Sequence, residues 1–296
     1  MSEGRIAFVG LGEAASAFIL GWGATRAGTI RAWDIKTASH ETAAVIAKRA
    51  DGLGVTACAS AAEALAGADL VFSTVTADQA VAAAQDCAPH LAPGALWCDL
   101  NSCAPASKQR AEGIVTAAGG RYLDVAVMAP VHPKRNLVPC LISGPQAEAV
   151  AQLLTALPMQ VRVVGETVGR ASSIKLVRSI MVKGMEALTA ECVLAAVAAG
   201  VEDEVFPSLK DGHPGIDVPA HAAYNFERSL VHGARRAAEM DEAAQMLGDL
   251  GLPGDMSAAT ARWQRALSSG GVEMPEGATP DHVWFARAYL RRFQEG

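Results

Sequence analysis

Short apolar segments alternate with Ala-rich segments of helical periodicity through the first 165 residues of the chain. This alternation predicts βαβ units, because a parallel strand is reached through a crossover that is usually a helix. The expected strands are residues 5–9, 29–33, 55–58, 69–75, 95–99, 122–127, 139–143 and 161–164. The expected helices are residues 14–26, 37–50, 77–90, 106–118 and 146–157. We therefore predict an α/β domain over residues 1–165, with a doubly wound, mainly parallel sheet covered by helices.

The pattern changes after residue 165. Residues 168–199 contain no proline, and their apolar positions recur at the helical spacings of three and four: Ile174, Val177, Met181, Met185 and Leu188. A helix of this length is about 45 Å long, enough to leave the first domain and open a second. Further helical patterns cover 220–251, 255–269 and 280–294, and a loop is expected at Pro207 and over 210–219. Residues 166–296 are thus expected to form an all-α domain joined by a long helix.

Composition narrows the possible classes of protein. The 296 residues suit two domains, and 51% hydrophobic with 19% charged residues exclude a largely disordered chain. A net charge of −6 argues against a nucleic-acid partner, and there is no apolar segment long enough to span a membrane. The N-terminal residues lack a secretory signal, and the six cysteines form no C-x-x-C pair. We expect a cytoplasmic protein with free thiols and no metal site.

A glycine-rich turn follows the first expected strand. It has the pattern G-x-G-x-x-A between a strand and a helix, in which Gly10 permits a tight turn and Gly12 lets a pyrophosphate approach the backbone. The small residue that ends the pattern allows close contact between helix and sheet, and the helix start offers unpaired N–H groups. The alternative is a glycine turn with no ligand. The expected cofactor-binding residues of this turn are Gly10, Gly12, Glu13, Ala14 and Ala15.

An acidic residue ends the second expected strand, about twenty residues after the glycines. Asp34 can accept hydrogen bonds from the ribose hydroxyls of an adenosine and repels a 2′-phosphate, which favours NAD. Lys36 and Arg31 lie close by in the sequence and are able to pair with a phosphate, so NADP stays open. Further cofactor contacts are expected at the end of the fourth strand, at Thr74, Val75 and Thr76.

Lys175 is the candidate for the proton transfer that accompanies a hydride transfer. It lies early in the long helix among small and apolar residues, where burial would lower the pKa of its amine. Arg178 and Ser179 follow at i+3 and i+4, so the three side chains can share one helix face. The alternative is a surface lysine on an ordinary helix.

Four segments occur in the order and spacing typical of the β-hydroxyacid dehydrogenases, relatives of 6-phosphogluconate dehydrogenase. They are Gly10-Leu11-Gly12, Asp99-Leu100-Asn101-Ser102 with Pro105, Asp124-Val125-Ala126-Val127, and Gly169 six residues before Lys175. The resemblance covers the first 200 residues. It implies a Rossmann domain coupled to an all-α domain, a homodimer, and oxidation of a 3-hydroxy acid with NAD or NADP. It also implies that Lys175 is the catalytic lysine and that Asn101 and Ser102 bind the substrate.

The chain departs from the family pattern where substrate would bind. It has Met128-Ala129-Pro130 in place of the family's serine and glycines, and Ser179 in place of an asparagine, as in a divergent bacterial subgroup. The basic groups His132 and Arg178, near these segments, are candidates for binding a small anionic or polar substrate. Two alternative functions stay open: an imine reductase, from a related branch that typically replaces the lysine, and a non-catalytic NAD(P)-binding sensor.

Overall fold

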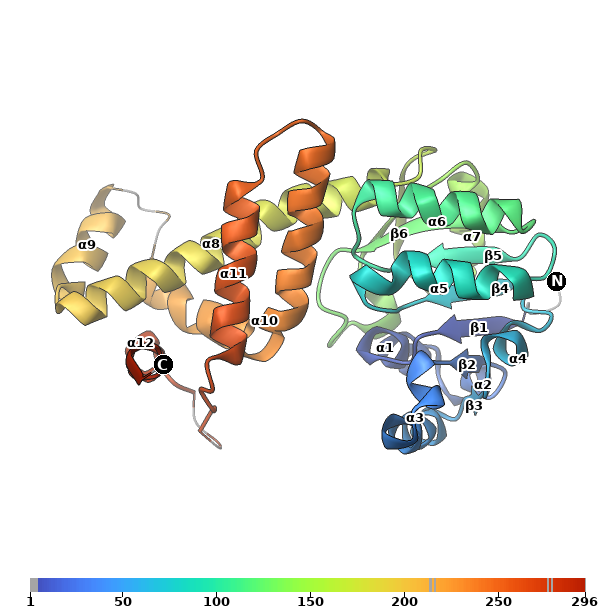
Figure 1. Cartoon of the computed structure of the whole chain (residues 1–296), viewed down its shortest axis with the longest axis horizontal. Helices are drawn as coiled ribbons and strands as arrows, with labels where there is room; N and C mark the ends of the chain where they lie inside the picture. Colours follow the sequence, from blue (N-terminus) through green and yellow to red (C-terminus); the bar gives the residue numbers. More distant parts are fainter. Residues whose placement is uncertain (1–4, 213–214, 216, 276, 278, 296) are drawn as a thin grey trace. The chain divides into compact units, whose positions relative to one another are not determined.

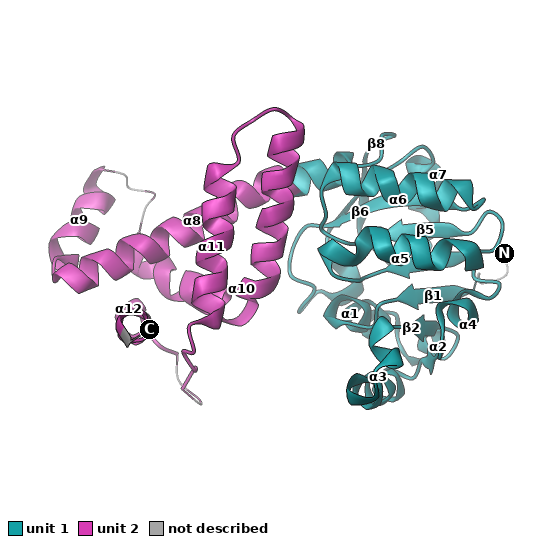
Figure 2. Cartoon of the chain, in the orientation of Figure 1, with its two compact units in different colours: residues 1–175 teal, residues 176–296 magenta. Residues whose placement is uncertain are grey.

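The computed structural model describes residues 5–212, 215, 217–275, 277 and 279–295. The chain divides into two compact units, Met1–Lys175 and Leu176–Gly296 (Figure 2). The division falls inside α8 (Arg170–Ala199), which begins in unit 1 and continues in unit 2. The domain boundary expected after residue 165 stays a prediction.

Unit 1 is built on an eight-stranded sheet with the order β3-β2-β1-β4-β5-β6-β7-β8. Neighbouring strands are parallel, except that β6 and β7 are antiparallel. The chain adds β2 and β3 on one side of β1 and then returns to place β4 on the other side, so the strand order reverses between β1 and β4. The strands are β1 (Ile6–Val9), β2 (Arg31–Trp33), β3 (Thr56–Ala57), β4 (Leu70–Ser73), β5 (Leu96–Asp99), β6 (Arg121–Val127), β7 (Cys140–Ser143) and β8 (Val161–Gly165). The predicted doubly wound, mainly parallel sheet is confirmed.

Helices cover both faces of this sheet (Figure 1). Successive residues of β1 point to opposite faces: Ile6 and Phe8 pack into one hydrophobic cluster, and Ala7 and Val9 pack into another. The first cluster receives residues from α1, α3 and α7, and the second from α4, α5 and α6. The helices of unit 1 before α8 are α1 (Glu13–Trp22), α2 (Ala24–Ala27), α3 (His40–Leu53), α4 (Ala61–Leu65), α5 (Ala80–Cys87), α6 (Pro105–Ala117) and α7 (Ala147–Ala156). Four short 3-10 helices are η1 (Ile35–Ala38), η2 (Ala77–Gln79), η3 (Ala88–His90) and η4 (Arg135–Leu137).

The regular elements of unit 2 are all α-helices among its described residues, as predicted. After α8 come α9 (Glu202–Gly212), α10 (Val218–Asp249), α11 (Asp255–Ser269) and α12 (His282–Glu295). Its core is aromatic, with Phe226 of α10 stacked on Phe285 and Tyr289 of α12. Helices α10 and α11 approach closely at Gly233, where an added Cβ would lie 2.4 Å from the carbonyl oxygen of Gln264. No helix in the described parts of the chain combines the length and the apolar character that a membrane crossing needs.

Two local predictions were wrong. The loop expected at Pro207 and Lys210 is part of α9, whose buried Phe206 packs in the core of unit 2 and outweighs the local proline signal. Of the rest of that loop, 213–214 and 216 lie outside the described residues, and Asp217 caps α10 by accepting the Ala220 N–H. The helix expected over 14–26 is divided into α1 and α2 at Gly23, which has a φ of +87°.

Candidate functional site

The glycine-rich turn lies between β1 and α1, at the point where the strand order reverses. Gly10 has a φ of +87°, and a Cβ added to it would lie 2.8 Å from the carbonyl oxygen of Thr74. A Cβ added to Gly12 would meet no atom within 4 Å, so open space remains beside the backbone there. Ala15 is fully buried in the sheet-facing side of α1, while Glu13 and Ala14 form the first turn of that helix. One glycine thus permits close packing inside the protein, and the other leaves room for a ligand.

Asp34 is held against this turn from the end of β2. Its Oδ2 accepts the Leu11 N–H at 2.9 Å, and its Oδ1 accepts the Lys36 N–H at 3.0 Å. The Lys36 side chain is exposed, and Arg31 forms an ion pair with Glu63 at 3.6 Å. The carboxylate is therefore fixed beside the glycines, and one of the two cations considered as phosphate partners is paired elsewhere.

The chain leaving β4 supports the other side of the turn. Thr74 donates its hydroxyl to the Gly10 carbonyl at 2.8 Å and its N–H to the Val9 carbonyl at 2.8 Å. Val75 would lie against a Cβ added to Gly10, whereas Thr76 is exposed and precedes η2. Thr74 and Val75 thus shape the turn, and of the three only Thr76 is fully exposed.

The residues present fit a dinucleotide. Besides the open space at Gly12, the structure provides an unsatisfied acceptor at the end of the neighbouring strand β5: Asn101 is buried, and its Oδ1 has no hydrogen-bond partner among the described residues. Its Nδ2 donates to Ser73 Oγ at the end of β4, at 3.0 Å, which fixes the amide in one orientation. A buried acceptor without a partner is costly, so this atom favours a bound group that donates a hydrogen bond.

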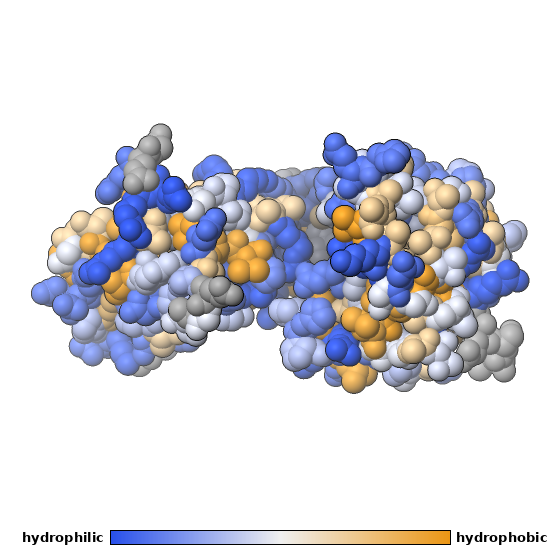
Figure 3. Space-filling model, turned by 90° about the horizontal axis from the view of Figure 1, so that it is seen from below, coloured by the Kyte–Doolittle hydropathy of each residue, from blue (hydrophilic) through white to orange (hydrophobic). Residues whose placement is uncertain are grey.

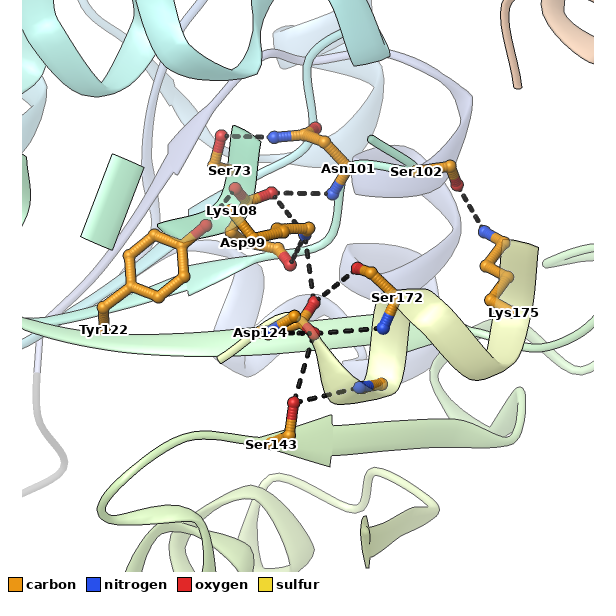
Figure 4. A network of polar contacts seen from close by, with 12 residues as sticks. Ser73, Asp99, Asn101, Ser102, Lys108, Tyr122, Asp124, Ser143, Ser172 and Lys175 are labelled. Atoms are coloured by element: carbon orange, nitrogen blue, oxygen red, sulfur yellow. Dashed lines mark hydrogen bonds and ion pairs between the residues drawn. The ribbon is translucent and has the colours of Figure 1, made fainter. Parts of the chain in front are cut away.

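Lys175 and Ser102 meet across this edge of the sheet (Figure 4). Ser102 lies in the loop between β5 and α6, Lys175 lies in the second turn of α8, and Lys175 Nζ donates a hydrogen bond to Ser102 Oγ. Both residues are half-buried. The Cys140 thiol of β7 is also close: burial raises its pKa to about 12, and the positive charge of Lys175 opposes that rise. The structure therefore brings together Asn101, Ser102 and Lys175, three of the predicted site residues.

Beside this pair lies a buried ionic network of Asp99, Lys108, Tyr122 and Asp124 (Figure 4). Lys108 Nζ lies 2.9 Å from Asp99 Oδ1 and 3.3 Å from Asp124 Oδ1, and it donates to the Asp99 carbonyl at 2.7 Å. Burial alone would lower the pKa of Lys108, but the two carboxylates outweigh burial and hold that pKa above its ordinary value. Tyr122 donates its hydroxyl to Asp99 Oδ2 at 2.5 Å, and burial together with that carboxylate raises the pKa of the phenol. The network is a cation held between two carboxylates, with each partner hydrogen-bonded.

Asp124 also caps the start of α8. Its Oδ2 accepts the N–H groups of Gly169 and Ser172, and its Oδ1 accepts the Ser172 hydroxyl at 2.7 Å. Ser143 of β7 accepts the Ala171 N–H at 3.0 Å and donates to Asp124 Oδ2. The first N–H groups of a helix have no partner within the helix, and here two strands of the sheet provide the acceptors.

The structure places the remaining predicted substrate residues as follows. His132 is exposed in the loop between β6 and β7. Arg178 is exposed, and Ser179 is buried, on the part of α8 that belongs to unit 2. Ser179 Oγ accepts from Lys183 Nζ at 3.1 Å, and Lys183 pairs with Glu239 of α10 at 2.5 Å. Ser179 is thus part of an ionic cluster within unit 2.

The sequence prediction did not include Lys108. A signal was present, because Ala104, Ala111 and Val115 lie at helical spacings from Lys108 and are all buried. A lysine on the apolar face of a helix needs a buried counter-charge. The acidic residues that end β5 and lie within β6 provide it, but their proximity to α6 follows only from the folded sheet. The described residues contain no group of three or more potential metal ligands.

Comparisons with known proteins agree with this geometry. Residues 5–165 match the family described as the NAD binding domain of 6-phosphogluconate dehydrogenase, and residues 196–267 match a domain of unknown function, DUF1932. A conserved hypothetical protein from Sinorhizobium meliloti is 37% identical, with 97% of this chain and 96% of that chain covered and a TM-score of 0.76.

Two solved enzymes share the fold at lower identity. They are the 3-hydroxyisobutyrate dehydrogenase of Mycobacterium tuberculosis (18% identity, TM-score 0.72, 97% and 99% covered) and an imine reductase from Myxococcus stipitatus in complex with NADP+ (19% identity, TM-score 0.54, 97% and 99% covered). The fold is that of the 3-hydroxyacid dehydrogenases, and unit 1 is an NAD(P)-binding Rossmann domain. The chain belongs to the family defined by the NAD-binding domain of 6-phosphogluconate dehydrogenase.

Proposed function

We propose that this oxidoreductase oxidises the hydroxyl group of a small 3-hydroxy acid or sugar acid, with Lys175 as the proton acceptor. The observation that carries the proposal is the hydrogen bond between Lys175 Nζ and Ser102 Oγ, beside the Asn101 amide, at the edge of the sheet where the parallel strands β1, β4 and β5 end. A bound nicotinamide would supply the hydride acceptor for the hydroxyl-bearing carbon. The hydroxyl proton then needs an acceptor within hydrogen-bond reach, and a neutral lysine amine meets that need.

The roles of the neighbouring residues follow from their chemistry. The Ser102 hydroxyl orients the Lys175 amine and can donate to a substrate oxygen, and the free Asn101 Oδ1 can accept from a hydroxyl or amide group. We propose NAD as the preferred cofactor, because the Asp34 carboxylate is fixed beside the glycine turn and would repel a 2′-phosphate. NADP stays possible, since Lys36 is exposed close by.

The substrate class is inferred from charge. Arg178 on α8 offers a positive charge that suits a carboxylate or phosphate, and His132 in the exposed loop after β6 offers an imidazole that can hydrogen-bond to one. An oxidised 3-hydroxy acid is a β-keto acid, whose decarboxylation would be assisted by a protonated Lys175 next to the carbonyl oxygen. Ser179 is a further proposed substrate contact. It would bind the substrate while its Oγ still accepts the hydrogen bond from Lys183.

The test is absorbance at 340 nm with NAD and NADP, across hydroxy acids, sugar acids and cyclic imines. Lys175→Met should lower kcat by at least about 10²-fold, the typical contribution of a general base, while the dissociation constant for NADH stays within a factor of two or so. Lys48→Met is the matched control, because Lys48 is exposed on α3 and contacts none of these residues.

Three outcomes would contradict the proposal. Turnover of cyclic imines instead of acids would indicate an imine reductase. Binding of NADH without turnover of any acid, and with Lys175 dispensable, would indicate a nucleotide-binding sensor. Wild-type turnover by Lys175→Met would remove the lysine from the mechanism.

A further inference from the structure

We propose that Lys108 is a positioning residue: its ammonium joins the loop that carries Ser102 to the helix that carries Lys175, and so sets the geometry of that pair. The inference rests on the proposed role of Lys175 as proton acceptor. Lys108 itself lies at the fourth position of α6, is fully buried, and contacts neither Ser102 nor Lys175 in the polar network of Figure 4. Its effect on the site is therefore indirect.

The three N–H donors of Lys108 match three acceptors. They are the Asp99 carbonyl oxygen, Asp99 Oδ1 and Asp124 Oδ1, at 2.7, 2.9 and 3.3 Å. An ammonium has three donors and no acceptor, so the group is satisfied in this one orientation. Lys108 thus joins β5 and β6 by providing the positive charge that balances the two buried carboxylates.

The Asp99 contacts fix the loop that carries Ser102. Asp99 Oδ1 accepts the Asn101 N–H at 2.9 Å, which folds the chain back directly after β5. Tyr122 holds the second carboxylate oxygen. Ser102 follows one residue later and precedes α6, whose first turn carries Lys108 itself. The ion pair between Asp99 and Lys108 therefore joins the two ends of the loop that carries Ser102.

The Asp124 contacts fix the start of α8. This one carboxylate binds Gly169 and Ser172, which lie three to six residues before Lys175, while Ser143 binds the N–H between them. Gly169 also packs against α6: its φ is +95°, and an added Cβ would lie 2.9 Å from Pro105 Cβ. The starts of α6 and α8 therefore touch, and the Lys108 ammonium connects the two carboxylates that anchor them.

Replacing Lys108 by methionine distinguishes two contributions of this residue: filling space in the core, and positioning the site through its charge. Lys108→Met keeps an unbranched, flexible side chain in the same space but removes the charge, the hydrogen bond to the Asp99 carbonyl and both ion-pair contacts. If Lys108 only fills the core, the site keeps its properties. If Lys108 positions the site, the Ser102–Lys175 geometry relaxes, and the loss falls on catalysis instead of on cofactor binding, since the glycine turn does not contact the network.

The closing experiment measures the titration of Lys175 directly, without a substrate. The seven lysines of the chain are labelled by reductive methylation with ¹³C-formaldehyde, and the Lys175 resonance is assigned by its absence in Lys175→Arg. In Lys108→Met we expect its titration midpoint to move by more than about half a pH unit, because the hydrogen bonds around the amine change. Lys48→Met should leave that midpoint unchanged.

Kinetics provide the second readout. We expect kcat of Lys108→Met to fall about 10–100-fold with KM changed less than about 3-fold, as for a misplacement near 1 Å, and NADH affinity to be retained. A lowered melting temperature with an unmoved Lys175 midpoint and unchanged kcat would overturn the proposal. If the wild type oxidises no acid, only the proposed function is refuted. The titration of Lys175 in Lys108→Met would still test whether Lys108 positions the Ser102–Lys175 pair.

A second variant covers the case in which Lys108→Met fails to fold. Ser143→Ala removes the acceptor of the Ala171 N–H and the hydroxyl that donates to Asp124, the carboxylate through which Lys108 acts on α8, but leaves the buried charges in place. It should shift the Lys175 midpoint in the same direction by a smaller amount. A midpoint identical to that of the wild type in Ser143→Ala would contradict the proposal.

Discussion

Gly10 is the residue at which a single added carbon has the most predictable effect. Its φ of +87° is unfavourable for a side chain, and a Cβ would lie 2.8 Å from the Thr74 carbonyl oxygen. We expect Gly10→Ala to lower the free energy of unfolding by roughly 1–3 kcal/mol and to weaken NADH binding, because the turn must open. Gly113→Ala is the control: Gly113 lies exposed inside α6 with no atom near an added Cβ, so this change should raise stability by up to about 1 kcal/mol. Chemical unfolding and NADH fluorescence titration measure both effects, and equal stability of the two variants would contradict this account.

At the scale of elements, α8 and α10 are joined inside unit 2 by buried charges. Lys183 pairs with Glu239 at 2.5 Å, and Arg236 pairs with Glu186. Burial lowers the pKa of Lys183 although the Glu239 carboxylate raises it, which indicates that desolvation outweighs the pairing.

A double-mutant cycle on this pair follows from that balance. Lys183→Met and Glu239→Gln should each cost about 3–5 kcal/mol, because one buried group loses its partner, and the double variant should cost less than the sum. Urea unfolding measures the four proteins, with Lys210→Met as a control on an exposed ion pair, whose loss should leave the free energy of unfolding nearly unchanged because water screens the two charges. Additive costs would show that the two side chains do not interact.

At the scale of the whole molecule, exposed apolar side chains indicate self-association. Met181, Met185 and Leu188 of α8 are 65%, 58% and 63% exposed, and their spacing of four and three places them on one helix face. Figure 3 shows hydrophobic patches among hydrophilic side chains on the surface. Large exposed apolar patches mark protein interfaces, and twofold assemblies are the commonest oligomers, so we propose a homodimer.

The dimer prediction is tested by charge on that helix face. Met185→Glu should shift the mass measured by light scattering toward the monomer, because dimerisation would bury an unpaired carboxylate. Val45→Glu, on an exposed apolar residue of α3 in unit 1, should leave the mass unchanged. A wild type that is monomeric at micromolar concentration would contradict the proposal.

The sequence by itself determined the features that depend on local patterns. Periodicity predicted the strands and most helices, but not α4 or α9. The glycine turn, the acidic end of β2 and the long α8 lie where their motifs predicted them. That Lys175 and Ser102 both belong to the active site was expected only through family resemblance, and their hydrogen bond, between residues 73 positions apart, was not predicted. Asn101 and Ser102 were predicted, but the free acceptor of Asn101 was not.

Only the tertiary structure decided the contacts between distant segments. The pairing of Lys108 with Asp99 and Asp124 depends on β5 and β6 lying side by side beneath α6, and the capping of α8 by Asp124 spans 45 to 48 residues. Pro207 likewise could not be placed from local sequence. Proline predicted a loop there, but the burial of Phe206 in the core of unit 2 keeps Pro207 inside α9. The physical reason is that local propensities are worth a few tenths of a kcal/mol to about 1 kcal/mol per residue for all residues but proline. Buried charges and core contacts are worth several kcal/mol and exist only after the chain has folded.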